Sequence, residues 1–343
     1  MKRIKLLLFV HILVLTIILT GCSSASSKPA QSSTTQTPGT SIVADAAKAY
    51  FANMPADIYK IAEKDFVDKV KANEAMFIID IRQAADYDQG HIMGAVNIPW
   101  GEAIAQKLSN LPKDKAIMVY CYTGQTAGQT VALLNVAGFK AKSVNLGWNL
   151  GISKVEGVAG VTETKANPVP EGKTQVAPEI QKAITDYFDK MTALNGTTYA
   201  NYKISEDNAK AVLDTKDPSV MFLSVRKAED FDKGHIPGAI NLPFAKGMQA
   251  YFGPLLPTDK KIIVYCYTGQ TAGQTVAILR LLGYDAVSLN SGMGTEATPG
   301  TGWVNKGFPV VGDAGASGPA QGTSTPSQST PTNQPQPSAG DHS

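Results

Sequence analysis

The sequence predicts two α/β domains in tandem, each built as a parallel sheet with helices on both faces. A stretch of fourteen residues at 119–132 returns unchanged at 264–277, and each copy contains the single cysteine of its half, Cys121 or Cys266. Matching residues continue beyond this stretch at offsets that drift only from 143 to 145, which indicates a duplicated domain. Within each half, short apolar runs alternate with helical stretches, the pattern of a parallel sheet covered on both faces.

The elements of the first half follow from this alternation. The apolar runs at 76–81 and 116–121 predict buried strands, because they are rich in Ile, Val and Met with little alternation. Gly138 and Gly283 follow the last helical stretch of their halves, where a left-handed backbone is favoured. Each cysteine is expected where a central strand ends and a helix begins, the usual place for sites in such sheets. Helices are predicted at 63–73, 102–110 and 126–136.

Composition divides the rest of the chain. Residues 6–19 form an apolar run after a basic start, too short to span a bilayer and typical of a signal peptide. The segments rich in Ser, Thr, Gln and Pro cannot bury enough apolar surface to order themselves. The predicted parts are a signal peptide at 1–21, a flexible tether at 22–42, a first domain at 43–152, a linker at 153–177, a second domain at 178–312 and a disordered tail at 313–343.

The end of the signal peptide suggests a lipid anchor. Leu19-Thr20-Gly21-Cys22 resembles the lipobox of bacterial lipoproteins. The resemblance implies cleavage before Cys22, lipid attachment to its sulfur, and an extracytoplasmic protein anchored to a bacterial membrane. The alternative is an ordinary signal peptide with an incidental cysteine.

Charge and cysteine content exclude several classes of protein. A net charge of +2 with 17% charged residues gives no sign of a nucleic-acid partner. Once Cys22 is lipidated, one thiol remains per domain, so neither domain can close an internal disulfide. One cysteine and one histidine per half are too few ligands for a zinc or iron site, and we expect no metal and no cofactor.

The loop after each cysteine is expected to hold an anion. A short glycine-containing loop that leads into a helix turns backbone N–H groups inward, and the helix N-terminus adds roughly half a positive charge. Both effects favour thiolate, the nucleophilic form of cysteine. Thr126 and Thr271 are predicted N-caps, whereas Tyr122 and Tyr267 either line the site or pack structurally. The predicted binding residues are Tyr122, Thr123, Gly124, Gln125 and Thr126 in the first loop and Tyr267, Thr268, Gly269, Gln270 and Thr271 in the second.

Three sequence blocks occur in the same order in both halves. In the first half they are Asp80-Ile81-Arg82, Gly90-His91-Ile92-Met93-Gly94-Ala95 and Cys121-Tyr122-Thr123-Gly124-Gln125-Thr126. In the second half they are Val225-Arg226, Gly234-His235-Ile236-Pro237-Gly238-Ala239 and Cys266-Tyr267-Thr268-Gly269-Gln270-Thr271, and a closing element follows, Trp303-Val304-Asn305-Lys306-Gly307-Phe308-Pro309-Val310. Together these blocks resemble the rhodanese domain. Two departures from that pattern stand out: Ser224 takes the place of Asp80, and the first half lacks a closing Trp element after Trp148.

The resemblance implies a sulfurtransferase. Cys121 and Cys266 would each take sulfane sulfur from thiosulfate or a polysulfide, form a persulfide, and pass the sulfur to a thiol, cyanide or a protein cysteine. The backbone N–H groups at 123–126 and 268–271 would stabilise the developing charge. The histidines and arginines of the blocks, His91, His235, Arg82 and Arg226, are expected to be structural.

Two other classes of protein compete with this interpretation. Phosphatases and arsenate reductases with a similar cysteine loop need an arginine to clamp phosphate, and Ala127 and Ala272 occupy that position here. A low-turnover protein for sulfur binding, sulfur delivery or thiol redox in the cell envelope remains open. Because the loops contain no Lys or Arg, we expect weak affinity for thiosulfate. A disulfide between Cys121 and Cys266 is a further possibility if the two loops face one another.

Overall fold

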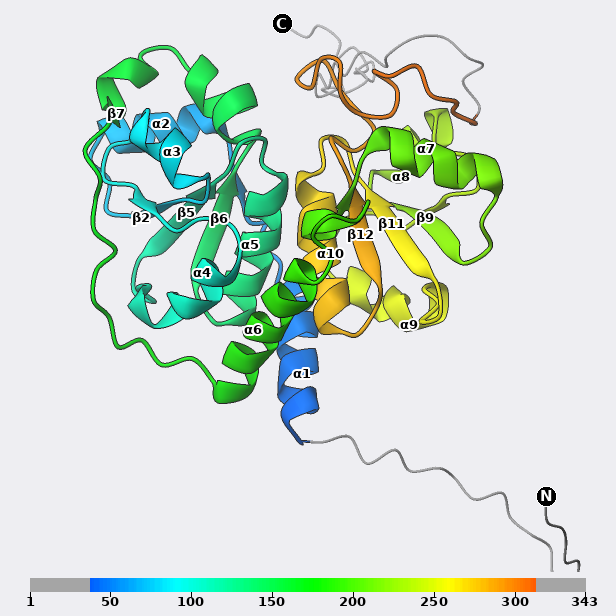
Figure 1. Cartoon of the computed structure of the whole chain (residues 1–343), viewed down its shortest axis with the longest axis horizontal. Coiled ribbons are helices and arrows are strands. Elements are labelled where there is room, and N and C mark those ends of the chain that lie inside the picture. The colour runs from blue at the N-terminus through cyan, green and yellow to red at the C-terminus, as the bar shows by residue number, and fades with distance from the viewer. Residues whose placement is uncertain (1–37, 313–343) are drawn as a thin grey trace, which may run out of the picture. The chain divides into compact units, whose positions relative to one another are not determined.

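The computed structural model describes residues 38–312 (Figure 1). The predicted signal peptide, Cys22 and the predicted tail at 313–343 lie outside the described residues. Helix α1 (Pro38–Ala52) begins within the segment predicted as a tether, so the last residues of that segment are helical. A buried apolar side holds this helix in place, with Ala47 and Phe51 fully buried.

Each half contains a five-stranded parallel sheet, and the two sheets have the same strand order when one is read in reverse. The central strands β5 and β11 are buried along most of their length. This confirms the predicted fold class of two tandem α/β domains. The first sheet runs β1 (Lys60–Ile61), β6 (Lys140–Val144), β5 (Ala116–Tyr120), β2 (Phe77–Asp80), β4 (Val96–Asn97), and the second β10 (Ile240–Asn241), β9 (Val220–Ser224), β11 (Lys261–Tyr265), β12 (Ala286–Leu289), β8 (Lys203–Ile204).

The helices cover both faces of each sheet (Figure 1). The predicted helix at 102–110 is interrupted at Lys107 and continues as a 3-10 turn, Leu108–Asn110. Gly138 and Gly283 have φ of 84° and 92° after their helices, the left-handed conformation that the sequence predicts. The helices are α2 (Glu63–Lys71), α3 (Ala84–Asp88), α4 (Glu102–Gln106) and α5 (Gln125–Val136), then α6 (Pro178–Thr192), α7 (Glu206–Thr215), α8 (Ala228–Lys233), α9 (Phe252–Leu255) and α10 (Gln270–Leu281).

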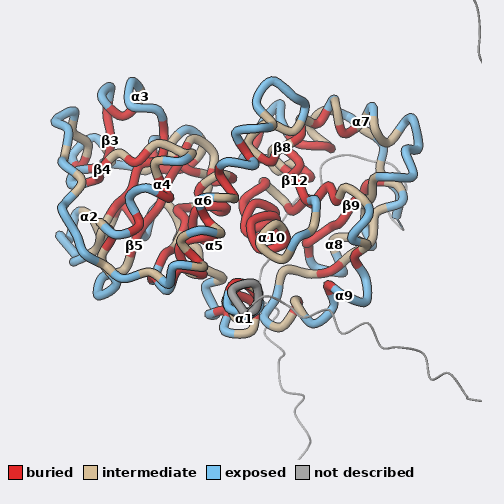
Figure 2. Tube along the Cα trace, turned by 60° about the horizontal axis from the view of Figure 1, so that its bottom comes forward, coloured by how far each residue is buried: buried red, intermediate tan, exposed pale blue. Residues whose placement is uncertain are grey.

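The helices α5 and α10, which follow the two cysteine loops, pack against each other between the sheets. Both are buried on nearly every side, as Figure 2 shows for α10. One hydrophobic cluster includes residues of both halves, among them Leu134 and Leu279, whereas the opposite face of each sheet has a separate cluster around Phe66 or Trp303. The central core is therefore shared by the two domains.

Two glycines allow α5 and α10 to approach this closely. A Cβ atom on Gly128 would lie 2.3 Å from the carbonyl oxygen of Gln270, and one on Gly273 would lie 2.4 Å from that of Gln125. Since any side chain would force the helices apart, both positions require glycine. The repeat is thus identical beyond the cysteine loop for a reason other than chemistry: each copy packs against the other, as in a symmetric dimer interface.

The helices that precede the two sheets cross over to the opposite half. Tyr50 on α1 donates a hydrogen bond from its hydroxyl to Gln274 Oε1 on α10, at 2.6 Å. Tyr187 on α6 donates in the same way to Gln129 on α5. These buried bonds join the central helix of each half to the helix that leads into the other half, so the two halves are linked in both directions.

Part of the predicted linker is packed against the first domain. Strand β7 (Thr162–Glu163) pairs antiparallel with β3 (His91–Ile92), and Val161 is buried beside it. This segment takes the place of the closing Trp element, whose Trp303 is fully buried in the second half.

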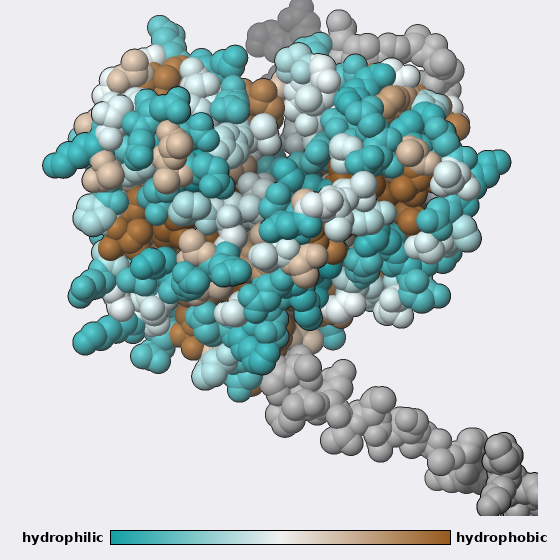
Figure 3. Space-filling view, viewed as in Figure 1, coloured by the Kyte–Doolittle hydropathy of each residue, from teal (hydrophilic) through white to brown (hydrophobic). Residues whose placement is uncertain are grey.

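The described residues contain no helix with the length and apolar character that a bilayer span needs. Figure 3 shows polar residues over much of one face, with separate apolar spots.

We predict that Gly128→Ala lowers the stability of the protein. Alanine is the better helix former by about 1 kcal/mol, but the added methyl group collides with a backbone oxygen, and overpacking costs about 1–3 kcal/mol. The midpoint of urea unfolding should therefore fall. The control is Gly160→Ala, where an added Cβ meets nothing within 4 Å. Equal midpoints for the two variants would contradict the close helix contact.

Candidate functional site

The two cysteines occupy equivalent places directly after central strands. Cys121 follows β5 and Cys266 follows β11, and both are free thiols with 2% of their surface exposed. In each half the loop then turns into the central helix, α5 or α10. A free thiol at this depth is reachable by small molecules more readily than by a folded partner.

Each sulfur accepts at least one hydrogen bond from a backbone N–H group of its loop. Cys121 Sγ accepts hydrogen bonds from Gly124 N at 3.1 Å and Ala127 N at 3.4 Å, and Cys266 Sγ accepts one from Gly269 N at 3.1 Å. The two glycines have φ of 91° and 92°, a left-handed conformation that turns the backbone around the sulfur. Ala127 lies outside the N–H groups that the sequence predicts. This arrangement favours a negative charge on sulfur.

The prediction that Thr126 and Thr271 are the N-caps of the two helices is wrong. The helices begin at Gln125 and Gln270, so the N-cap positions are Gly124 and Gly269, which have no capping side chain. In the first half the sulfur accepts a hydrogen bond from the backbone N–H of Ala127, the third residue of the helix. A Ser or Asp side chain at an N-cap would accept the hydrogen bond from this same N–H group. The cysteine itself therefore caps the helix, and the threonines lie within the first turn.

The loop glutamines bind across to the opposite half. Gln125 Nε2 donates to Ser288 Oγ at 2.7 Å and to the carbonyl of Leu289 at 3.1 Å. Gln270 Nε2 makes the reciprocal bond to Ser143 Oγ at 2.7 Å. Each amide also lies against the other loop, since a Cβ on Gly269 would come within 2.9 Å of Gln125 Cδ. The two cysteine loops are therefore structurally joined.

The loop tyrosines anchor their loops to neighbouring helices. The hydroxyl of Tyr122 donates to Asp86 on α3 and accepts from the backbone N–H of Gln83 at 3.0 Å. Tyr267 donates to Asp230 on α8, and burial together with this bond raises the pKa of Tyr267 to about 12. Of the two roles left open for these tyrosines, the structure supports packing. Thr123 and Thr268 are partly buried in the bend between cysteine and helix.

A second segment supports each loop, and it was not predicted. The backbone N–H groups of Trp148 and Met293 donate to the carbonyls of Cys121 and Cys266, both at 2.7 Å. The glycines before them, at 147 and 292, approach so closely that a Cβ would lie 2.4 Å from the same carbonyl oxygens. The signal was present in the sequence as an Asn-x-Gly triplet repeated at 145–147 and 290–292.

The histidines lie away from the sulfur atoms. His91 stacks on Tyr87 with ring centroids 3.5 Å apart, and its Nδ1 contacts the carbonyl of Tyr87 at 2.8 Å. His235 stacks in the same way on Phe231 at 3.8 Å and contacts that residue's carbonyl. These contacts hold the Gly-His-Ile turns in shape, which is the structural role expected of the histidines.

The buried arginines differ between the halves. Arg82 forms a salt bridge to Asp80 at 2.7 Å, donates to the carbonyl of Gly90 and lies over the Trp148 ring at 4.3 Å. Arg226 faces Ser224 instead, and its Nε is buried without a hydrogen-bond partner among the described residues. The departure noted in the sequence therefore removes an ion pair and leaves an orphaned donor.

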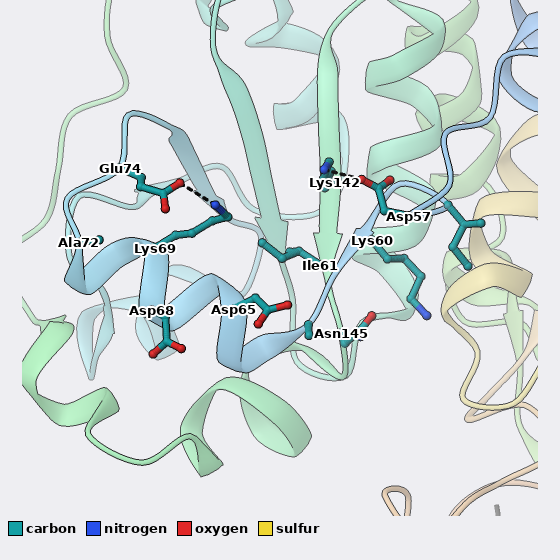
Figure 4. A pocket seen from close by; sticks show the side chains of 12 residues that line it. Asp57, Lys60, Ile61, Asp65, Asp68, Lys69, Ala72, Glu74, Lys142 and Asn145 are labelled. Atoms are coloured by element: carbon teal, nitrogen blue, oxygen red, sulfur yellow. Dashed lines mark hydrogen bonds and ion pairs between the residues drawn. The ribbon is translucent and has the colours of Figure 1, made fainter. Parts of the chain in front are cut away.

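A surface pocket lies beside β1. It is lined by charged side chains, which include the ion pairs Lys142–Asp57 and Lys69–Glu74 (Figure 4). No residue of either cysteine loop contributes to its lining. Lys60 and Asn145 form its edge nearest the second half (Figure 4). The two thiols themselves therefore lie outside this pocket.

Comparison with known proteins identifies the family. Residues 62–152 and 205–294 match the Rhodanese-like domain, together more than half of the chain, so this protein belongs to the rhodanese family with two such domains. Both cysteines and the loops that follow them lie within the two matched ranges.

Several relatives are similar to part of the chain. YrkF of Bacillus subtilis, provisionally named a sulfur carrier protein, is 30% identical over 91 residues, and the chain spans about half of its length, 48%. The Saccharomyces cerevisiae thiosulfate:glutathione sulfurtransferase is 28% identical, with 30% of this chain and 86% of the relative covered. The Escherichia coli 3-mercaptopyruvate sulfotransferase SseA covers 68% of this chain and 97% of its own, at 19% identity and a TM-score of 0.31.

We predict that Ser224→Asp stabilises the second domain. The new carboxylate would accept from the orphaned Arg226 Nε, and an unsatisfied buried donor typically costs about 1–3 kcal/mol. Urea unfolding should show a higher midpoint. The matched variant Asp80→Ser should lose about 3–5 kcal/mol, because it breaks the buried pair of the first half. A lower midpoint for Ser224→Asp would contradict this prediction.

Proposed function

We propose that this protein is a sulfurtransferase that carries sulfane sulfur as a persulfide on Cys121 and Cys266. The observation that carries the proposal is the backbone N–H group of a left-handed glycine, Gly124 or Gly269, which donates to the cysteine sulfur at 3.1 Å in both halves. Such donors stabilise a thiolate and the charge that develops on a transferred atom. The neutral side chains of the loops make the site suited to sulfur rather than to phosphate, which needs an arginine clamp.

The reaction has two balanced steps. The cysteine thiolate attacks the outer sulfur of thiosulfate or a polysulfide, a new S–S bond forms, and the donor's S–S bond breaks with its electron pair leaving on sulfite or the shorter polysulfide. A nucleophilic acceptor (a thiolate, cyanide or a protein cysteine) then attacks the outer persulfide sulfur. The S–S bond breaks and the cysteine thiolate returns. No net oxidation occurs and no cofactor is consumed.

Two of the relatives named above support a role in sulfur transfer, since they are called a sulfur carrier and a thiosulfate:glutathione sulfurtransferase. The burial of both thiols, 2% exposed, favours the second candidate as well, a carrier that takes up sulfur and releases it slowly. The two candidates share the persulfide and differ in turnover.

The proposal predicts that incubation with thiosulfate or polysulfide adds the mass of one sulfur atom to each cysteine. Intact-protein mass spectrometry measures it on the native chain and on Cys121→Ser and Cys266→Ser, each of which should keep one addition. Thiocyanate formation from cyanide then separates an enzyme from a slow carrier. If no donor adds sulfur to either cysteine, the proposed function is wrong.

We also propose that the protein is anchored outside the cytoplasm by lipid on Cys22, which rests on the lipobox-like segment ending at that residue. When the chain is expressed in a bacterium with labelled palmitate, the label should follow the protein and be lost in Cys22→Ala. Equal labelling of both would contradict the anchor. This test is independent of the sulfur chemistry.

A further inference from the structure

The edge strand β1 carries a lysine toward the cysteine loop of the other half. Lys60 is the register partner of Ser143 on β6, and Ser143 Oγ accepts the bond from Gln270 of the Cys266 loop at 2.7 Å. Register partners in a sheet project to the same face, because side chains alternate along each strand. Lys60 therefore lies on the face that the Cys266 loop covers.

The second half repeats this arrangement in the opposite direction. Lys203 on β8 is the register partner of Ser288 on β12, and Ser288 Oγ accepts from Gln125 of the Cys121 loop at 2.7 Å. Each cysteine loop thus contacts a serine from the other half, and each serine has a lysine beside it.

Neither lysine has a partner of its own. Within the residues whose side chains are described, 42–312, neither Nζ forms a hydrogen bond or an ion pair, whereas Lys142 on the adjacent strand pairs with Asp57. Figure 4 shows Lys60 pointing away from that pair toward the gold ribbon of the second half. A partly buried, unpaired cation is costly, which suggests that an anion completes the site.

The charge environment agrees with the crossed arrangement. Burial lowers the pKa of Lys60, while Cys266 and Glu63 act in the opposite direction. Burial also lowers the pKa of Lys203, and there the opposing groups are Cys121 and Glu206. In each half the thiol that acts on the lysine pKa therefore belongs to the other half, in agreement with the strand register.

The same unusual turn precedes both lysines. Ile58 and Tyr59 have φ of 50° and 58°, and Asn201 and Tyr202 have φ of 58° and 52°. Left-handed backbone is rare for side chains of this size, and it persists where the surrounding structure requires it. The hydroxyls of Tyr59 and Tyr202 then donate to the carbonyls of Tyr50 and Tyr187, so in both halves the backbone directly before the lysine is held to the preceding helix.

We propose that each sulfur site is completed across the domain boundary: Lys203 binds the anionic donor at Cys121, and Lys60 binds it at Cys266. This rests on the proposed function and specifies the substrate class, a negatively charged sulfane donor. A thiolate attacking such a donor brings like charges together, and the loops at 122–126 and 267–271 contain no cation to offset them. The lysine from the other half supplies that charge.

The test compares an anionic with a neutral alkylating reagent at each cysteine. Iodoacetate and iodoacetamide react by the same displacement, so the ratio of their rates reports local charge and not nucleophilicity. Trypsin separates the cysteines into peptides ending at Lys140 and Arg280, which mass spectrometry quantifies independently. Lys203→Gln should lower the ratio of the iodoacetate rate to the iodoacetamide rate at Cys121 by at least about threefold and leave the ratio at Cys266 unchanged. Lys60→Gln should lower the ratio at Cys266 by a similar factor and leave the ratio at Cys121 unchanged.

Each variant contains its own control, because the unaffected cysteine reports a folded protein. Lys142→Gln removes an equivalent charge from the next strand and should change neither ratio. The rate at which thiosulfate adds sulfur should likewise fall at Cys121 in Lys203→Gln and at Cys266 in Lys60→Gln. Lys203→Arg, which keeps the positive charge, should partly restore the rate at Cys121. Effects on the cysteine of the same half, or ratios unchanged in all variants, would overturn the proposal. If the native protein takes up no sulfur but the crossed ratios are found, the lysine sites stand and the sulfurtransferase function fails.

Discussion

The contact between α5 and α10 is the constraint on which the rest of the structure depends. Both helices begin at a cysteine loop, so their mutual position fixes both loops at once. Gly128 and Gly273 permit backbone contact that no larger residue allows. The glutamines at the start of the helices then reach the other half's strands. A displacement at this crossing would disturb the two sites together, which accounts for the identity of the repeat throughout the contact.

Around that contact the two halves have diverged. The outer faces of the sheets have separate cores, so a substitution there affects one half only. Asp80 faces Arg82 in the first half, whereas Ser224 leaves Arg226 partly unsatisfied in the second. The first half closes with β7 and the second with a buried Trp303. Residues at the shared interface lack this freedom, because each contacts the equivalent segment of the other half.

The domain boundaries of the chain therefore do not coincide with the boundaries of the sites. The helix before each sheet bonds to the central helix of the other half through Tyr50 and Tyr187. Strands β1 and β8 direct Lys60 and Lys203 across the same boundary. A single domain excised from this chain would lose the hydrogen bond that its central helix accepts from Tyr50 or Tyr187. In the proposed arrangement of the sites it would also lose the lysine opposite its cysteine.

The sequence by itself determined the fold class, the strand–cysteine–loop–helix order and the residues of both loops. These follow from local patterns: apolar runs for strands, a glycine that turns the backbone, and a repeat that marks each copy. It misassigned Thr126 and Thr271 as caps, because a cysteine sulfur is not an expected capping group. Only the tertiary structure decided that Gln125 and Gln270 bind across the boundary. Their partners, Ser288 and Ser143, lie far away in the chain, and the contacts come from the packing of two helices, which no local sequence pattern predicts.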